Sequence, residues 1–239
     1  MKQAKFSADG KDYIMAYDCP DKEIKDQINE IFSQQCYKEA KRRKDMVVLD
    51  VGANVGMFSL FIRDYAKKIY AIEPSKRCFA ALKENTKDWD NIELFNVGFF
   101  NRKGKRLLYG KGEETPQTML LKGEHTELVD TITIEEFMSE NKIDHIDLMK
   151  VDTEGAEYVI FADDSFKRVA NKIDFIIGES HYLGDMSPEH VLLMLKKAGF
   201  KAKILPLKNY IQYVNYENIY TKQKDRYEVK RATLFVGER

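Results

Sequence analysis

A glycine-rich loop between two acidic residues is the first feature of the sequence that could do chemistry. An apolar run ends at Asp50 and is followed by Gly52, Asn54 and Gly56, and a second apolar run ends at Glu73. An acid at the end of the second strand of a nucleotide-binding fold accepts hydrogen bonds from ribose hydroxyls. The pattern therefore predicts a site for a ribosylated ligand at the amino end of the helix that follows the loop.

The middle of this loop indicates which nucleotide could bind. A dinucleotide fingerprint has glycine at the place of Asn54, so that the backbone can approach a pyrophosphate. Asp50 adds a negative charge that would repel a diphosphate and tolerate a sulfonium. The pattern favours S-adenosylmethionine (SAM) over NAD, and a turn that binds nothing is the third interpretation. Asn96, after the third predicted strand, could offer its amide to adenine or be a turn residue before Gly98.

A second group of titratable residues follows the next two predicted strands of the sheet. Asp152 and Glu154 follow one apolar run, and Glu179 and His181 follow the other. In a doubly wound sheet these strand ends face the same crevice as the glycine loop. Lys150 lies one pleat back on the face of Asp152, and we expect a structural ion pair there.

The elements that must position these residues alternate between strands and helices. Strands are predicted over 46–51, 68–72, 91–97, 144–152, 172–179, 200–205 and 231–236, and helices over 21–44, 75–88, from 133, and over 186–198. This order predicts an α/β fold with a doubly wound, mostly parallel seven-stranded sheet and an antiparallel last strand.

Three segments lie outside this plain alternation. Residues 1–45 are predicted to form an arm, with a hairpin at Asp9-Gly10, and a helix that belong to the same domain as 46–239. The arm could cover the mouth of the site, but core packing is the simpler role. The segment 99–134 predicts an inserted hairpin near the substrate, and the tyrosine-rich segment 209–230 could shape the substrate pocket.

Composition limits the classes of partner. The 239 residues are 44% hydrophobic, enough for one α/β domain with a full core. The 39 basic residues balance the 39 acidic ones, so no bulk field attracts nucleic acid or an anionic membrane. Three separated cysteines predict reduced thiols, and the absence of a signal core or of a run of ~20 apolar residues predicts a soluble cytoplasmic protein.

Several motifs together resemble the FkbM-type methyltransferases, which depend on SAM. The resemblance runs from about residue 46 to 181 and rests on VVLDVGANVGMFSL, YAIEPS, TITIEEF, LMKVDTEGAE and GESH. The family pattern KxDxEGxE is met by Lys150, Asp152, Glu154, Gly155 and Glu157. The resemblance implies a Rossmann-like class I methyltransferase fold and O-methylation of a hydroxyl on a sugar, polyketide or similar small metabolite. It does not cover the first forty residues, the insertion or the tyrosine-rich segment.

Methyl transfer to a hydroxyl constrains the roles of the second group. The reaction is an in-line displacement in a dry site, and a base that takes the hydroxyl proton accelerates it. We assign His181 as this base, oriented by Glu179 or Asp152, with Glu154 on the acceptor or on the amino group of the cofactor. In the alternative, these four side chains hold a divalent metal ion, which the sequence does not favour.

Other classes of function stay open at the level of sequence. An NAD-dependent oxidoreductase is disfavoured by Asn54, and a non-catalytic cofactor-binding module is disfavoured by the acids at the strand ends. A nucleic-acid methyltransferase is disfavoured by the balanced charge and by the lack of an Asn-Pro-Pro-aromatic tetrapeptide. The expected partner is a small-molecule hydroxyl acceptor, and the sequence predicts no oligomeric state.

Overall fold

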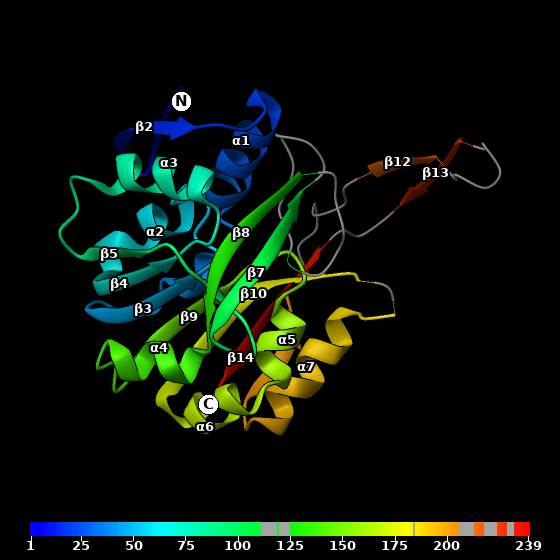
Figure 1. Ribbon diagram of the computed structural model, residues 1–239. Helices are drawn as coiled ribbons and strands as arrows, with labels where there is room; N and C mark the ends of the chain where they lie inside the picture. The colour runs from blue at the N-terminus through cyan, green and yellow to red at the C-terminus, as the bar shows by residue number, and fades with distance from the viewer. Residues whose placement is uncertain (111–118, 120–124, 184, 206–212, 218–223, 229–231) are drawn as a thin grey trace.

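A seven-stranded sheet forms the centre of the protein (Figure 1). The computed structural model describes residues 1–110, 119, 125–183, 185–205, 213–217, 224–228 and 232–239. In spatial order the strands are β11 (Lys201–Ile204), β14 (Ala232–Glu238), β10 (Ile173–His181), β9 (Ile146–Val151), β3 (Met46–Val51), β4 (Ala66–Ile72) and β5 (Ile92–Phe95). Only β14 runs antiparallel to its neighbours in this sheet. The predicted doubly wound, mostly parallel sheet with an antiparallel last strand is confirmed.

The order of the strands explains where a ligand can bind. The chain leaves β3 toward β4 and β5, then returns to place β9 on the other side of β3. The carboxyl ends of β3 and β9 therefore flank the switch point at which the connections diverge, and this is where ligands bind in open α/β sheets. Every residue of β3 and β9 except the second of each strand is buried, as their apolar sequences predict.

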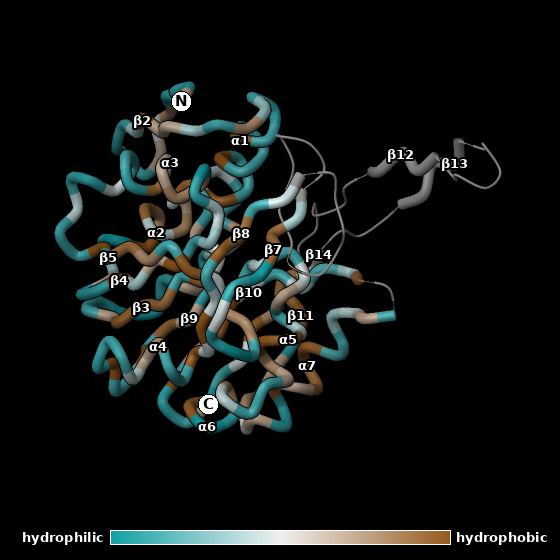
Figure 2. Tube along the Cα trace, in the orientation of Figure 1, coloured by the Kyte–Doolittle hydropathy of each residue, from teal (hydrophilic) through white to brown (hydrophobic). Residues whose placement is uncertain are grey.

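Helices cover both faces of the sheet. One face packs against α1 (Asp21–Ile28), α2 (Met57–Ile62) and α3 (Lys76–Thr86), and the other against α4 (Ile134–Glu140), α5 (Glu157–Ala162), α6 (Asp164–Val169) and α7 (Pro188–Lys197). Apolar residues concentrate along the central strands, and polar ones lie toward the outside (Figure 2). The sheet thus separates two hydrophobic cores, which fix the position of each strand end.

The predicted helix over 21–44 is wrong in its length. Helix α1 continues as a π-helical segment, Asn29–Ser33, and a short 3-10 helix spans Lys38–Ala40. The chain leaves the first helical path at Gln35, whose φ of 50° is left-handed, as at many helix ends. The basic run 41–44 does not complete a helix dipole; Arg42 and Arg43 instead pair with Glu238 and Asp147.

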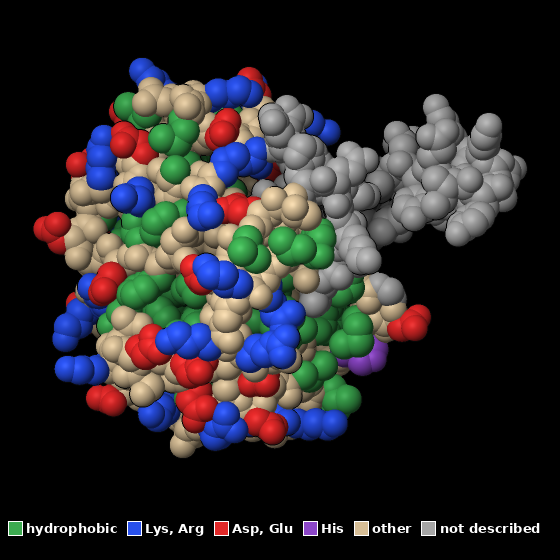
Figure 3. Space-filling view, viewed as in Figure 1, with side chains coloured by type: hydrophobic (Ala, Val, Ile, Leu, Met, Phe, Trp, Pro, Cys, Tyr) green, Lys and Arg blue, Asp and Glu red, His purple; other side chains and the backbone are tan. Residues whose placement is uncertain are grey.

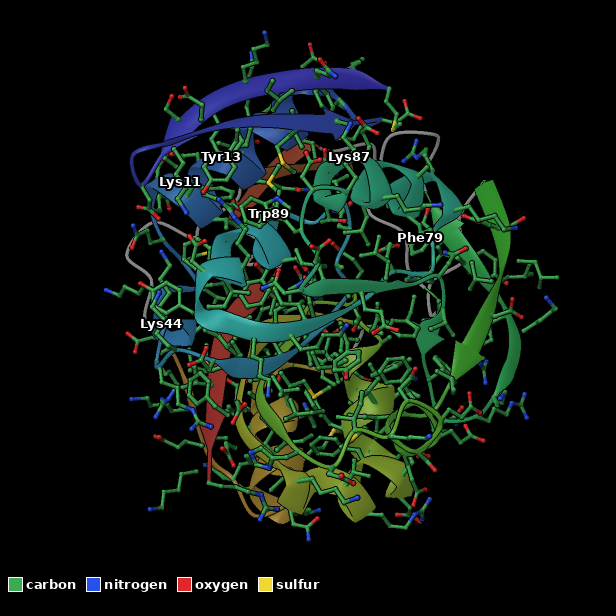
Figure 4. All side chains as sticks on the ribbon, turned by 90° about the vertical axis from the view of Figure 1, so that its left-hand side faces the viewer. Lys11, Tyr13, Lys44, Phe79, Lys87 and Trp89 are labelled. Carbon is green, nitrogen blue, oxygen red and sulfur yellow. The ribbon has the colours of Figure 1, made fainter. Side chains whose placement is uncertain are left out.

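An antiparallel hairpin of β1 (Lys2–Ala8) and β2 (Lys11–Tyr17) precedes α1. Its two turn residues, the predicted Asp9-Gly10, have φ of 50° and 72°, which suits a tight hairpin turn. Tyr13 of the hairpin and Trp89 lie near each other (Figure 4), and the guanidinium of Arg63 is 5.0 Å from the first ring and 4.2 Å from the second. The hairpin therefore packs on the core, whereas the predicted domain division at residue 45 stays a prediction.

The insertion forms a small sheet of its own. Strands β6 (Gly98–Phe99), β7 (Gly104–Gly110) and β8 (His125–Ile132) pair in the order β6-β8-β7, and β7 and β8 are the hairpin predicted within 99–134. In the tyrosine-rich segment, β12 (Tyr213–Glu217) pairs with β13 (Lys224–Glu228). The predicted role of that segment rests largely on residues outside the described ones.

The distribution of charged side chains on the surface and the state of the cysteines can be compared with the sequence. Lys/Arg and Asp/Glu side chains are mixed over the face seen in Figure 3. The three cysteines are free, as predicted. Across the described part of the chain, no helix has the length and apolar character needed to cross a membrane.

The predicted start of α4 yields a test of local stability. Oγ1 of Thr133 accepts a hydrogen bond from the backbone N–H of Glu136, whose carboxylate accepts one from the N–H of Thr133. Thr133→Ala removes half of this capping box and should lower the free energy of unfolding by about 1 kcal/mol. Urea denaturation measures this, with Ser139→Ala in the same helix as control. Equal effects of the two substitutions would contradict the capping role.

Candidate functional site

The loop after β3 fits only a narrow set of residues. Gly52 has a φ of 78°, and a Cβ there would lie 1.8 Å from the carbonyl oxygen of Asp152. Gly56, with a φ of 93°, precedes α2 and faces Leu82 so closely that a Cβ would lie 2.8 Å from it. Asn54 also has a left-handed φ of 51°. The loop is thus pressed against the segment after β9, which brings the two predicted groups of site residues together.

A buried lysine lies beneath this loop. Nζ of Lys150 donates a 2.6 Å hydrogen bond to the carbonyl oxygen of Gly52 and lies 3.4 Å from Asp50 and 3.7 Å from Asp152. Burial alone would lower the pKa of Lys150, but Asp50, Asp152 and Glu179 outweigh it and raise the pKa. The expected structural ion pair of Lys150 with Asp152 is confirmed. Asp50 is fully buried and also accepts a 2.7 Å hydrogen bond from Ser59, so it supports the loop from below.

A cavity opens at the carboxyl ends of β3, β4 and β9. Of the predicted site residues, Gly52, Asn54, Glu73, Asp152 and Glu154 line it. The other described lining residues are Asp18, Cys19, Glu23, Gln27, Val55, Ile72, Pro74, Ser75, Arg77, Cys78, Ala81, Leu108, Met119 and Thr153. Among the described residues, the lining contains five carboxylates and one cation, so the cavity is suited to a ligand with positive charge.

Glu73 occupies the position expected of a ribose-binding acid. Its two carboxylate oxygens accept 2.8 Å hydrogen bonds from the backbone N–H groups of Asn54 and Ser75. Burial raises the pKa of Glu73 to about 7, although these two hydrogen bonds and Lys150 oppose the shift. Each oxygen retains a second lone pair, so the carboxylate can also accept hydrogen bonds from two ribose hydroxyls.

Asn96 has a structural task at the same strand end. Its Nδ2 donates hydrogen bonds of 2.8 and 2.9 Å to the carbonyl oxygens of Glu73 and Pro74. The side chain therefore fastens the loop that carries Glu73, and Asn96 is not among the described residues that line the cavity. Its contact with adenine stays a prediction.

His181 lies between three carboxylates. Its Nδ1 is 3.1 Å from Glu157, and its Nε2 is 3.4 Å from Glu154 and 3.8 Å from Asp152. Burial alone would lower the pKa of His181, but Glu154, Glu157 and Asp152 raise it well above its ordinary value. The three carboxylates therefore favour the charged form of the imidazole.

The side chain at Nδ1 of His181 is one that the sequence did not predict. We expected Glu179 or Asp152 to orient the ring; Asp152 lies 3.8 Å from Nε2, but Glu157 forms the hydrogen bond to Nδ1. Glu179 accepts a 3.1 Å hydrogen bond from the hydroxyl of Tyr37 instead. Helix α5 begins at Glu157 and lies beside the end of β10. The side chain of Glu157 is therefore close enough to reach the ring of His181.

Three of the four side chains considered for a metal ion come together. One oxygen each of Asp152 and Glu154 and a ring nitrogen of His181 lie within 4.8 Å of one another, whereas Glu179 is not part of this set in the described structure. Carboxylate and imidazole donors at such distances can share a divalent cation. Metal dependence stays a prediction.

Sequence reasoning missed several residues around the cavity. Leu108 and Met119 come from the insertion, in line with its predicted place near the ligand. Glu23 and Gln27 of α1 line the mouth, and Glu30 follows one turn later with a pKa raised to about 7 by burial, Asp26 and Asp152. The spacing of 23, 27 and 30 marks one face of a helix and is a signal that could have found this group.

The fold and the site together indicate the class of protein to which the chain belongs. Seven strands in this order, one of them antiparallel, with a glycine loop at the switch point, form the class I methyltransferase fold. The sequence also matches the family model described as the methyltransferase FkbM domain over residues 50–202. The chain therefore belongs to the FkbM methyltransferase family, and the predicted family is confirmed.

Named relatives agree with this family over parts of their length. The chain is 28% identical over 160 residues to "Methyltransferase 1" of Beauveria bassiana, covering 54% of this chain and 62% of the relative. It is 43% identical over 60 residues to "31-O-demethyl-FK506 methyltransferase FkbM" of Streptomyces tacrolimicus, covering 23% of each. The matches thus span less than two thirds of these relatives.

Solved structures support the fold. The YcgJ protein of Bacillus subtilis superposes with a TM-score of 0.51 at 13% identity, covering 86% of this chain and 97% of that one. SMU.776, solved in complex with S-adenosylhomocysteine (SAH), superposes with a TM-score of 0.54 at 10% identity, covering 99% of this chain and 56% of that one. At such identities the likeness concerns the fold alone.

The raised pKa of Glu73 predicts how ligand affinity depends on pH. Because burial raises the pKa of Glu73 to about 7, a change of pH around neutrality changes the protonation of this carboxyl group. A protonated carboxyl group accepts hydrogen bonds from ribose less well, so affinity for SAH should fall as the pH decreases from about 8 to about 6. Calorimetry measures this, and Glu73→Gln should bind weakly with a flatter pH profile. Unchanged affinity in Glu73→Gln would contradict the assignment.

Removal of the buried ion pair beneath the loop should lower the stability of the protein strongly. Lys150→Met leaves the buried Asp50 carboxylate and the Gly52 carbonyl oxygen without their cation. We expect the free energy of unfolding to fall by about 3–5 kcal/mol, measured by urea denaturation. Lys105→Met, which breaks an exposed pair on β7, is the control and should have little effect. A loss as small as that of the control would show that Lys150 does not hold the loop.

Proposed function

We propose that this protein transfers the methyl group of SAM to a hydroxyl oxygen of a small metabolite. The observation that carries the proposal is the acidic cavity at the switch point, with Glu73 on one side and Asp152 and Glu154 on the other. SAM has ribose hydroxyls that can donate hydrogen bonds to Glu73, and it has a positive charge that Asp152 and Glu154 would attract. The FkbM relative of Streptomyces tacrolimicus, whose name specifies a 31-O-demethyl substrate, supports oxygen as the acceptor atom.

The same cavity is poorly suited to NAD. Five carboxylates in its described lining would repel a pyrophosphate, and Arg77 is the single cation that would attract one. Asn54 replaces the glycine that lets a backbone approach phosphate, and its N–H already donates to Glu73. These contacts favour a methyltransferase over an oxidoreductase.

The side chains around the cavity suit the demands of methyl transfer. When bound, SAM supplies an electrophilic methyl group on sulfur, and the protein must hold the acceptor in line with it. Asp152 and Glu154 are partly exposed, with 28% and 37% of their side chains accessible, so either can accept a hydrogen bond from the acceptor hydroxyl. His181, with 14% accessible, lies directly behind them and can take the proton at Nε2 after it has lost its own.

The direct test is transfer of a radiolabelled methyl group from SAM to a panel of small acceptors. The panel pairs each hydroxyl compound with its O-methylated form and with an amine analogue of the same skeleton. We expect label only in compounds with a free hydroxyl. Label in amine analogues alone would replace O-methylation by N-methylation, and binding of SAH without any transfer would favour a cofactor-binding module.

The assignment of His181 predicts a separation of binding from turnover. His181→Ala should leave SAH affinity intact and lower kcat by about 10²–10⁴-fold, because it removes the proton acceptor. In the wild type, kcat/KM should rise with pH through the raised His181 pKa, since only the neutral ring accepts a proton. Wild-type turnover in the variant would refute the assignment. A rate that falls over the same pH range would indicate that the cationic ring is required.

A further inference from the structure

Glu157 is a buried carboxylate that joins two parts of the site. It is the first residue of α5 and is fully buried. One carboxylate oxygen accepts hydrogen bonds from the backbone N–H of His181 at 2.7 Å and from its Nδ1 at 3.1 Å. The other accepts from Oγ1 of Thr153 and from the N–H of Gly155, both at 2.9 Å. The same side chain thus holds the end of β10 and the loop after β9.

The four partners require a side chain that only accepts hydrogen bonds. Two are backbone N–H groups, Thr153 donates its hydroxyl hydrogen, and Nδ1 of His181 donates when it carries hydrogen. An ionised carboxylate meets this demand with both oxygens, and an amide does not, because its NH₂ group would face two donors. Burial alone would raise the pKa of Glu157, but its hydrogen bonds and the charge of His181 lower it.

This geometry determines which ring nitrogen can exchange a proton. With Nδ1–H directed at Glu157, the neutral ring has its lone pair on Nε2. Nε2 is the atom that lies near Glu154 and Asp152, both of which line the cavity. A ring in the other tautomer would place a lone pair against the carboxylate, where it is repelled.

We propose that Glu157 is the positioning residue of the site: it fixes the tautomer and orientation of His181 and couples the ring to the loop 153–155. This inference rests on the proposed function, in which His181 takes the acceptor proton at Nε2. Glu157 is not among the described residues that line the cavity and is hydrogen-bonded to His181, so it acts through His181. The arrangement parallels the buried acid that orients the histidine in a catalytic triad.

The test combines NMR titration of the ring with kinetics of Glu157→Gln. The chain has four histidines, so comparison with His181→Ala assigns the His181 ring signal. The groups that face the ring are Asp152 and Glu154 from the loop and Glu157 from α5. We expect the titration midpoint of His181 to fall in Glu157→Gln, because one of these negative charges is lost. We expect kcat to fall about as far as in His181→Ala, roughly 10²–10⁴-fold.

A double substitution separates positioning from general damage. If Glu157 acts through His181, Glu157→Gln should cause little further loss of kcat in the His181→Ala background. Glu157→Asp keeps the charge and should restore part of the midpoint and the rate, and it replaces Glu157→Gln if that variant does not fold. Glu93→Gln, an exposed acid on β5, is the matched control and should leave both unchanged.

The outcomes distinguish failure of this inference from failure of the proposed function. An unshifted His181 midpoint in both Glu157 variants would overturn the positioning role, whatever the kinetics show. Equal fold-losses of kcat from Glu157→Gln with and without His181 would overturn it as well, since that pattern indicates an independent structural effect. Wild-type turnover in His181→Ala, together with a shifted His181 midpoint in the Glu157 variants, would give a different result. It would refute the assignment of His181 as the base and leave the orientation of the ring by Glu157 intact.

Discussion

The site depends on one buried cation. The ammonium of Lys150 lies at the meeting point of β3 and β9, where it binds the Gly52 carbonyl oxygen and faces Asp50 and Asp152. Without it, two carboxylates and a carbonyl oxygen would share a water-poor space and repel one another. Because Asp50 and Lys150 are direct neighbours in the sheet, the pairing follows from the register of the two strands. The glycine loop and the acid after β9 are therefore fixed relative to each other before any ligand binds.

Above this cation the charges are arranged in layers. Glu73, Asp152 and Glu154 reach the cavity, while Glu157 and His181 lie behind them and hold the loop after β9. Helix α1 and the insertion contribute further lining residues, among them Glu23 and Leu108. The strand ends thus supply the acidic wall of the cavity, and α1 and the insertion complete its described lining. Such a division explains how one fold can keep its cofactor chemistry while acceptor specificity varies.

The features that the sequence predicted correctly are those that depend only on neighbouring residues. Strand β3 has the predicted bounds because a run of six residues, five of them apolar, is followed by Gly52, where a Cβ would lie 1.8 Å from the carbonyl oxygen of Asp152. The hairpin turn at Asp9-Gly10 and the capped start of α4 follow from equally local rules. The sequence could not predict which residues from distant segments contact one another. The hydrogen bond between Glu157 and His181, 24 positions apart, depends on how α5 packs beside β10. Glu179, which we expected to orient His181, accepts a hydrogen bond from Tyr37, which is 142 positions away in the sequence. The helix predicted over 21–44 was wrong in its length because the helical spacing that predicted it ends at Phe32 and the left-handed Gln35 follows.

Calorimetric titration of the purified protein with SAM, SAH and NAD tests the central claim that the acidic crevice at the switch point accepts a sulfonium nucleotide and rejects a pyrophosphate. We expect saturable one-to-one binding of SAM and SAH, and no heat of binding with NAD at the same concentrations. Absence of binding by SAM and SAH, or saturable binding of NAD that competes with SAH, would contradict it.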